Sequence, residues 1–133
     1  MIGVIVATHG DFGNGLLSTL QMVMGTTEGI LSVPLASEDS METFQTKLET
    51  ALQKVDPKGE GTLVLVDMLG GTPFNVSLQM TQKRKIHVVT GVSLPMLIKV
   101  ASHRDETDLK AFALEVQKAS RESVITSVEL LKS

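Results

Sequence analysis

The chain has 133 residues, of which 42% are hydrophobic and 20% charged, a balance typical of a single folded domain spanning residues 1–133. The net charge of −3 and the lack of Trp and Tyr argue against nucleic acid as a partner, because neither a basic surface nor a stacking platform is available. There is no cysteine for a disulfide or a metal site, and no apolar run reaches the roughly 18 residues of a membrane span. The first residues lack a basic leader, which predicts a cytoplasmic protein.

Short apolar runs alternate with segments of helical periodicity along the chain. The runs predict buried strands at residues 2–7, 30–35, 63–66 and 86–89. Apolar side chains three or four positions apart predict helices over about residues 16–24, 44–55, 73–82, 96–101 and 108–120. In the tail, residues 124–131, β-branched side chains favour a strand, although the apolar positions also fit a helix face.

This alternation predicts an α/β fold: a doubly wound open sheet of four parallel strands in the order 2-1-3-4, with helices on both faces. In such folds, ligands bind outside the carboxyl ends of the strands, where the strand order reverses. Here that point lies between the first and third strands, whose ends are His9 and Asp67. The fold rule and the residue chemistry therefore predict a site at the same place.

The third predicted strand is followed at once by a helix start. The strand ends on Asp67, and Gly70 and Gly71 allow a tight turn because they lack a Cβ. Thr72 followed by Pro73 predicts the start of the helix, with threonine as its cap and proline at the first helical position. Because a helix N-terminus has free N–H groups and a favourable dipole for anions, this stretch predicts a phosphate site.

His9 is a candidate nucleophile, since neutral imidazole is available near neutral pH. A carboxylate at Asp67 that accepts the Nδ1 proton would fix the tautomer, leave Nε2 free and stabilise the imidazolium formed on phosphorylation. Gly10 leaves room for a partner to approach. Backbone N–H groups from Gly70 to Phe74, with the Thr72 hydroxyl, are candidates to hold the phosphoryl oxygens. Transfer of this kind depends on positioning and charge, so neither a metal nor a cofactor is expected.

Other interpretations of these residues are weaker. Gly10 and Gly15 have the spacing of a Walker A loop, but Leu16 and Leu17 stand where that motif needs Lys and Ser or Thr. The structural alternative is that His9 and Asp67 are polar residues at strand ends without a function. Gly70-Gly71-Thr72-Pro73 would then be an ordinary loop with a helix cap.

Three motifs lie at the predicted strand ends and helix starts: Thr8-His9-Gly10, Gly70-Gly71-Thr72-Pro73-Phe74-Asn75 and Gly91-Val92-Ser93-Leu94-Pro95-Met96-Leu97. With Val66-Asp67 they resemble the mannose-type EIIA family of the bacterial phosphoenolpyruvate-dependent sugar phosphotransferase system (PTS). The resemblance implies that His9 is phosphorylated by the carrier protein HPr, that Asp67 orients it and that Thr72 contacts the phosphate. The phosphoryl group would then pass to EIIB and finally to the sugar, at a membrane EIIC/EIID complex that the chain meets peripherally at most.

The resemblance also implies a homodimer that exchanges a C-terminal strand. Residues 124–131 would then lie antiparallel at the edge of the partner's sheet, an edge that an open four-stranded sheet leaves unpaired. Two alternatives of different function stay open. One is the phosphotransfer subunit of a PTS-dependent dihydroxyacetone kinase, and the other is a regulatory or structural module that senses phosphate or dimerises without turnover.

Overall fold

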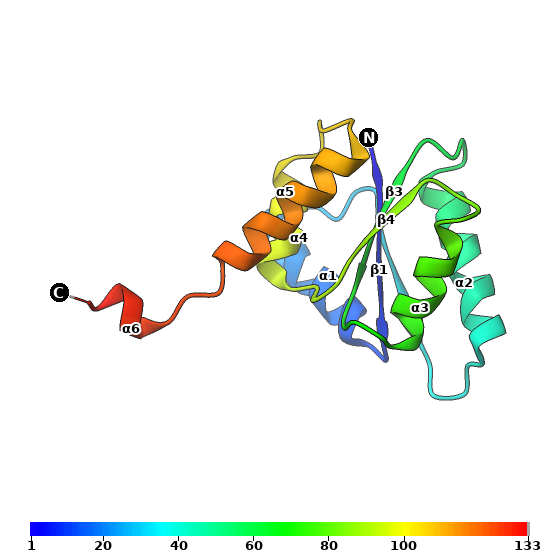
Figure 1. Cartoon of the computed structure of the whole chain (residues 1–133), viewed down its shortest axis with the longest axis horizontal. Helices are drawn as coiled ribbons and strands as arrows, with labels where there is room; N and C mark the ends of the chain where they lie inside the picture. Colours follow the sequence, from blue (N-terminus) through cyan, green and yellow to red (C-terminus); the bar gives the residue numbers. More distant parts are fainter. Residues whose placement is uncertain (133) are drawn as a thin grey trace.

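The computed structural model describes residues 1–132 and contains one open sheet of four parallel strands (Figure 1). The strands are β1 (Gly3–His9), β2 (Ile30–Leu35), β3 (Thr62–Val66) and β4 (Ile86–Val89). Their order is β2-β1-β3-β4, so β1 pairs with β2 on one side and with β3 on the other. The predicted parallel sheet and its strand order are confirmed.

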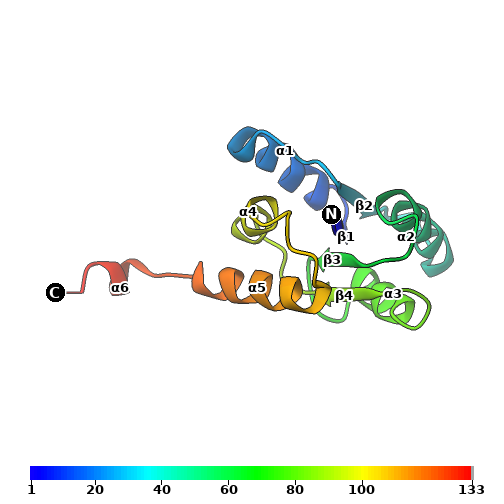
Figure 2. The same ribbon diagram turned by 90° about the horizontal axis from the view of Figure 1, so that it is seen from above.

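Helices cover both faces of this sheet, as Figures 1 and 2 show. One face carries α1 (Phe12–Met24), α4 (Leu94–Ser102) and α5 (Leu109–Glu122), and the other carries α2 (Met41–Val55) and α3 (Thr72–Met80). Among the described residues, no helix combines the length and the hydrophobicity that a membrane span requires.

The two central strands are buried on both faces because their alternate side chains enter two separate cores. The core beneath α1, α4 and α5 takes Val4, Val6, Leu63 and Leu65, and the core beneath α2 and α3 takes Ile5, Ala7, Val64 and Val66. This double burial explains why both strands are continuous apolar runs rather than alternating ones. It also fixes their register, since a slip of one residue would exchange the two sets of side chains.

The tail differs from the strand predicted for residues 124–131. In the single chain, a short helix, α6 (Ser127–Leu130), lies beyond α5 and projects away from the sheet (Figures 1 and 2). Thr126 caps it, because its Oγ1 accepts the N–H of Glu129 at 3.2 Å. A strand needs a neighbouring backbone to pair with, whereas a helical turn satisfies its own N–H groups. The apolar side chains of the tail are nevertheless left exposed: Val124, Ile125, Val128, Leu130 and Leu131.

Candidate functional site

The carboxyl ends of β1 and β3 bring together two residues that are 58 positions apart in the sequence. The two strands run in parallel, with Ala7 opposite Val66, so the residues that follow emerge at the same edge of the sheet. There, Nδ1 of His9 lies 2.8 Å from Oδ2 of Asp67. The two residues predicted to form the site are therefore in direct contact.

Asp67 holds the histidine by two bonds to the same oxygen. Besides the ring Nδ1, the backbone N–H of His9 also donates to Oδ2, at 3.0 Å. A carboxylate can only accept, so neutral His9 carries its proton on Nδ1 and has its lone pair on Nε2. The double contact restrains both the tautomer and the orientation of the imidazole. The His9 side chain is nonetheless 47% exposed, compared with 15% for Asp67, so the imidazole is accessible while the carboxylate is largely covered.

The surroundings of Asp67 favour its ionised form. Burial raises the pKa of Asp67, but the hydrogen bonds from the backbone and ring of His9 outweigh it and hold that pKa below the usual value of 3.8. The second carboxylate oxygen, Oδ1, is buried and has no side-chain or backbone partner within residues 1–132. Within residues 1–132, the hydrogen-bond partners of this carboxylate are therefore the backbone N–H and the ring of His9, both at Oδ2.

The imidazole lies against the first turn of α3. An ideal Cβ built on Gly71 would be 2.7 Å from Cε1 of His9 and 3.4 Å from Nε2. Gly71 is the cap residue of α3 and Thr72 is already helical, so the prediction that Thr72 caps the helix is wrong. The reason is that Gly71 holds the extended backbone of a cap, with φ −83° and ψ 171°, and no side chain provides the capping bond.

The first turn of α3, which follows Gly71, has N–H groups without an acceptor in the helix. Thr72 and Phe74 lie in the first turn, where N–H groups have no acceptor within the helix, and Pro73 has no N–H to offer. The Asn75 N–H already donates to Gly71 O at 2.9 Å. The Asn75 side chain donates to Gly70 O at 3.2 Å and so restrains the glycine turn. Sequence reasoning assigned no role to Asn75 beyond its place at the end of the motif that begins at Gly70.

The start of α1 follows His9 closely along the chain. Gly10 has φ +54° and open space around it, which fits its predicted part in leaving room for a partner. Gly13 then packs closely on the sheet, and its N–H donates to the buried Oγ1 of Thr8 at 2.9 Å. This bond fixes the start of α1 beside His9, and the sequence analysis did not foresee it.

Exposed apolar side chains also border the site. Phe12 at the start of α1 is 51% exposed, and Met68 and Leu69, in the turn after β3, are 53% and 71% exposed. Residues 1–132 contain no group of three or more His, Asp or Glu residues that could hold a metal ion.

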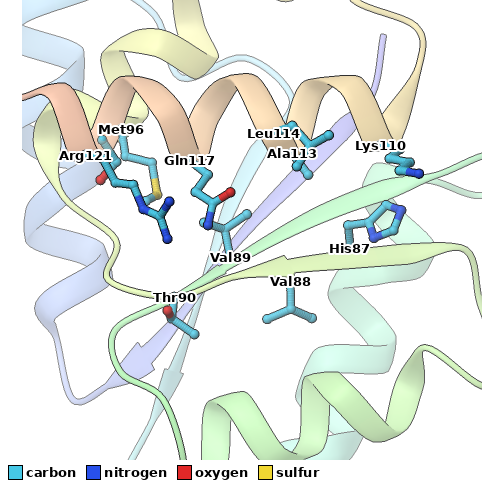
Figure 3. Close-up of a pocket in the computed structure, with 11 residues that line it drawn as sticks. His87, Val88, Val89, Thr90, Met96, Lys110, Ala113, Leu114, Gln117 and Arg121 are labelled. Carbon is cyan, nitrogen blue, oxygen red and sulfur yellow. The ribbon is translucent and has the colours of Figure 1, made fainter.

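A second concave feature lies apart from this site. A groove of about 440 Å³ runs between β4 and α5, and Figure 3 shows the side chains that line it. His87 lies on the strand side of the groove, while Lys110, Gln117 and Arg121 come from α5. None of the residues predicted for phosphoryl transfer lines it.

The fold and this geometry define an open α/β protein that presents an exposed histidine, held by an acid, at its switch point. The family model described as the PTS system fructose IIA component, EIIA-man, matches residues 3–117. The chain therefore belongs to the mannose-type EIIA family of the sugar phosphotransferase system.

Individual relatives agree with this assignment. The chain is 32% identical to the fructose-specific EIIA component of Bacillus subtilis over 92% of its own length and 84% of the relative's. It is 33% identical to the mannose-specific EIIAB component of Escherichia coli over 86% of its length, but spans only 36% of that longer protein. A crystal structure of a phosphotransferase system EIIA component from Streptococcus agalactiae superposes with a TM-score of 0.87 at 30% identity, covering 97% of this chain and 99% of that one.

Membership in the family confirms the predicted resemblance and gives the chain a general role as a phosphoryl carrier in PTS sugar transport. It favours an EIIA component over the alternatives of a dihydroxyacetone kinase subunit or a sensing module. Members of the family in general work with HPr and EIIB components.

Proposed function

We propose that phosphorylated HPr transfers its phosphoryl group to Nε2 of His9, and that His9 then passes the group to EIIB for sugar uptake and phosphorylation. The observation that carries this proposal is the 2.8 Å contact between Nδ1 of His9 and Asp67, because it leaves Nε2 as the free nucleophilic nitrogen on an exposed ring.

In this reaction the P–N bond of the donor phosphohistidine breaks as a P–N bond forms at Nε2. The donor imidazole leaves as a neutral group with the electron pair of the broken bond. His9 keeps its proton on Nδ1, so its ring becomes cationic, and the Asp67 carboxylate stabilises that charge. The N–H groups at the start of α3, with the Thr72 hydroxyl, Gly10 and the glycine turn, accommodate the phosphoryl oxygens. No proton has to enter or leave the site.

The surface around His9 suits a protein donor. Phe12 follows His9 closely in sequence, Met68 and Leu69 follow Asp67, and all three are exposed and can be buried when HPr or EIIB docks. We further propose that the chain acts in the cytoplasm, where it meets a membrane EIIC/EIID complex only through EIIB.

Reconstitution with Enzyme I, HPr and phosphoenolpyruvate tests the carrier role. We expect one acid-labile, base-stable phosphate on the chain, located at His9 by mass spectrometry, and its transfer to an added EIIB. The His9→Ala variant is expected to take no phosphate. His87→Ala provides a matched control, because His87 lines the groove beside β4 and is not part of the proposed site. Stable labelling of His9→Ala would contradict the assignment.

We also propose that the chain dimerises by exchanging its tail, with residues 124–131 of one copy pairing antiparallel to β4 of the other. The two edges of the sheet support β4 as the acceptor. The Thr62 N–H donates to the Lys85 carbonyl at 3.0 Å, so this carbonyl points towards β3. Along a strand of a parallel sheet, successive residues direct their N–H and C=O groups to alternate sides. The backbone groups of Ile86 and Val88 therefore point outward, away from the sheet. At the opposite edge, β2 contains Pro34, which has no N–H and whose carbonyl lies 3.5 Å from Lys47 Nζ.

The charge of the groove beside β4 is complementary to that of the tail. Lys110 and Arg121 line it (Figure 3), and the tail contains one acidic residue, Glu129, among exposed apolar side chains. Pairing would bury those side chains, and stability would then depend on protein concentration. Light scattering should find the full chain dimeric at micromolar concentration and a chain ending at Glu122 monomeric or prone to aggregate. A monomeric full chain would refute the exchange.

A further inference from the structure

We infer that Gly71 is a positioning residue for His9: the space left by its missing side chain sets where the imidazole lies relative to the start of α3. The inference rests on the proposed function, since it concerns the same histidine. Its basis is the contact that a Cβ at Gly71 would make, 2.7 Å from Cε1 of His9. Non-bonded carbon atoms approach favourably only to about 3.5 Å. Any side chain at this position therefore requires the ring or the helix to move.

The two adjacent glycines are needed for different reasons. Gly70 has φ +88°, a left-handed conformation that disfavours other residues, yet nothing lies within 4 Å of its Cβ position. Gly71 has φ −83° and ψ 171°, an extended conformation that any residue adopts. The requirement at Gly71 is therefore the contact with His9 and not the backbone.

Two neighbouring contacts restrain the imidazole. Asp67 Oδ2 binds both its Nδ1 and the His9 backbone N–H, at 2.8 and 3.0 Å. Gly71 lies against the adjoining ring atoms, Cε1 and Nε2. A methyl group at Gly71 has two ways to be accommodated. Either the ring shifts by about 0.8 Å and strains its bond to Asp67, or the first turn of α3 shifts and its N–H groups move away from Nε2.

Both movements alter the approach of Nε2 to the phosphoryl group. A misplacement of about 1 Å costs roughly a hundredfold in rate when the reacting groups depend on orientation. We expect a ten- to hundredfold loss in the maximal rate of phosphoryl transfer from HPr to His9. The apparent KM for HPr should change little, because the exposed side chains of Phe12, Met68 and Leu69 are unaltered.

The experiment compares Gly71→Ala and Gly71→Ser with Gly15→Ala. Alanine is a poor helix cap and serine a good one, whereas both place a Cβ against the imidazole. A contact with the ring therefore predicts that both variants are slow, while a capping role predicts that serine transfers as fast as the wild type. Gly15 lies in α1 with nothing within 4 Å of its Cβ position, so its alanine variant should transfer at the wild-type rate.

A second readout is independent of transfer. In ¹⁵N NMR spectra of the unphosphorylated protein, the wild-type His9 should show the tautomer with the proton on Nδ1. Both Gly71 variants should show a changed ring signal, with a smaller Nδ1–H population or a shifted Nε2 resonance. Wild-type rates together with an unchanged His9 spectrum in both variants would overturn the inference, as would recovery of rate by serine alone. If wild-type His9 takes no phosphate, the proposed function fails, but the NMR comparison still tests the contact.

Discussion

Replacing Asp67 by asparagine separates the charge of this residue from its geometry. The side chain keeps its shape, but one carboxylate oxygen becomes an amide nitrogen. The position now occupied by Oδ2 accepts two bonds from His9, one of them from a backbone N–H that can only donate. An amide nitrogen at that position would set one donor against another, the backbone N–H of His9. The amide oxygen of asparagine should therefore take the position of Oδ2. We therefore expect Asp67→Asn to keep the Nδ1–H tautomer and to lose only the charge.

The loss of charge sets the size of the effect. Hydrogen bonds to a charged partner contribute about 1.5–3 kcal/mol, compared with about 0.5–1.5 kcal/mol for neutral ones. Exchanging the charged acceptor for a neutral one therefore removes roughly 1–1.5 kcal/mol of stabilisation from the cationic ring, or about a five- to twelvefold in rate. Loss of the correct tautomer in acid–histidine pairs costs more, about 10⁴-fold.

Rapid-quench measurement of a single transfer from phosphorylated HPr distinguishes these cases. Asp11→Asn is the matched control, because Asp11 is an exposed acid close in sequence to His9 that makes no side-chain bond to it. The control should change the rate less than threefold. If Asp67→Asn also changes it less than threefold, Asp67 has no part in transfer. A loss near 10⁴-fold would refute the reasoning that the His9 backbone selects the amide oxygen.

Two further predictions concern stability. Thr8→Val should lower the free energy of unfolding by about 1–3 kcal/mol in urea titrations, because it leaves the Gly13 N–H without its buried acceptor, while Thr8→Ser should retain most of it. The pKa of Asp67 is lowered on folding, so this group stabilises the protein above its unfolded value of 3.8 and the contribution is lost as pH falls through the folded value. Asp67→Asn should therefore show a shallower loss of stability than the wild type as the pH is lowered below about 4.5.

The arrangement of the sheet was predictable because the sequences of its two central strands are by themselves typical of buried parallel strands. The apolar runs that form β1 and β3 are continuous, which is the pattern of strands buried on both faces, and parallel pairing leaves few possible orders. Once these strands are neighbours, the residues at their carboxyl ends must share an edge. The meeting of His9 and Asp67 therefore follows from the sheet, although the bond from the His9 backbone to Oδ2 does not.

The details that sequence reasoning missed depend on contacts across the turn. Thr72 and Gly71 are both acceptable caps by composition, and the choice depends on which of them keeps an extended backbone before the helix, which is Gly71. The bond from Asn75 to the Gly70 carbonyl likewise exists only after the turn has formed. The tail is a different case: the structure has the short helix α6 at Ser127–Leu130, and the proposed strand at residues 124–131 depends on a partner chain.

The proposed carrier must also protect its phosphoryl group from water between encounters, and the geometry of Asp67 bears on this requirement. A carboxylate beside a phosphohistidine can act as a general base that activates water. Here Oδ2 is occupied by two donors from His9, and Oδ1 is buried. Neither oxygen is placed to take a proton from a water molecule approaching the exposed ring. In the proposed mechanism, the acid beside the cationic ring is thus not placed to activate water, and the docking protein that would cover Phe12, Met68 and Leu69 would exclude water during transfer.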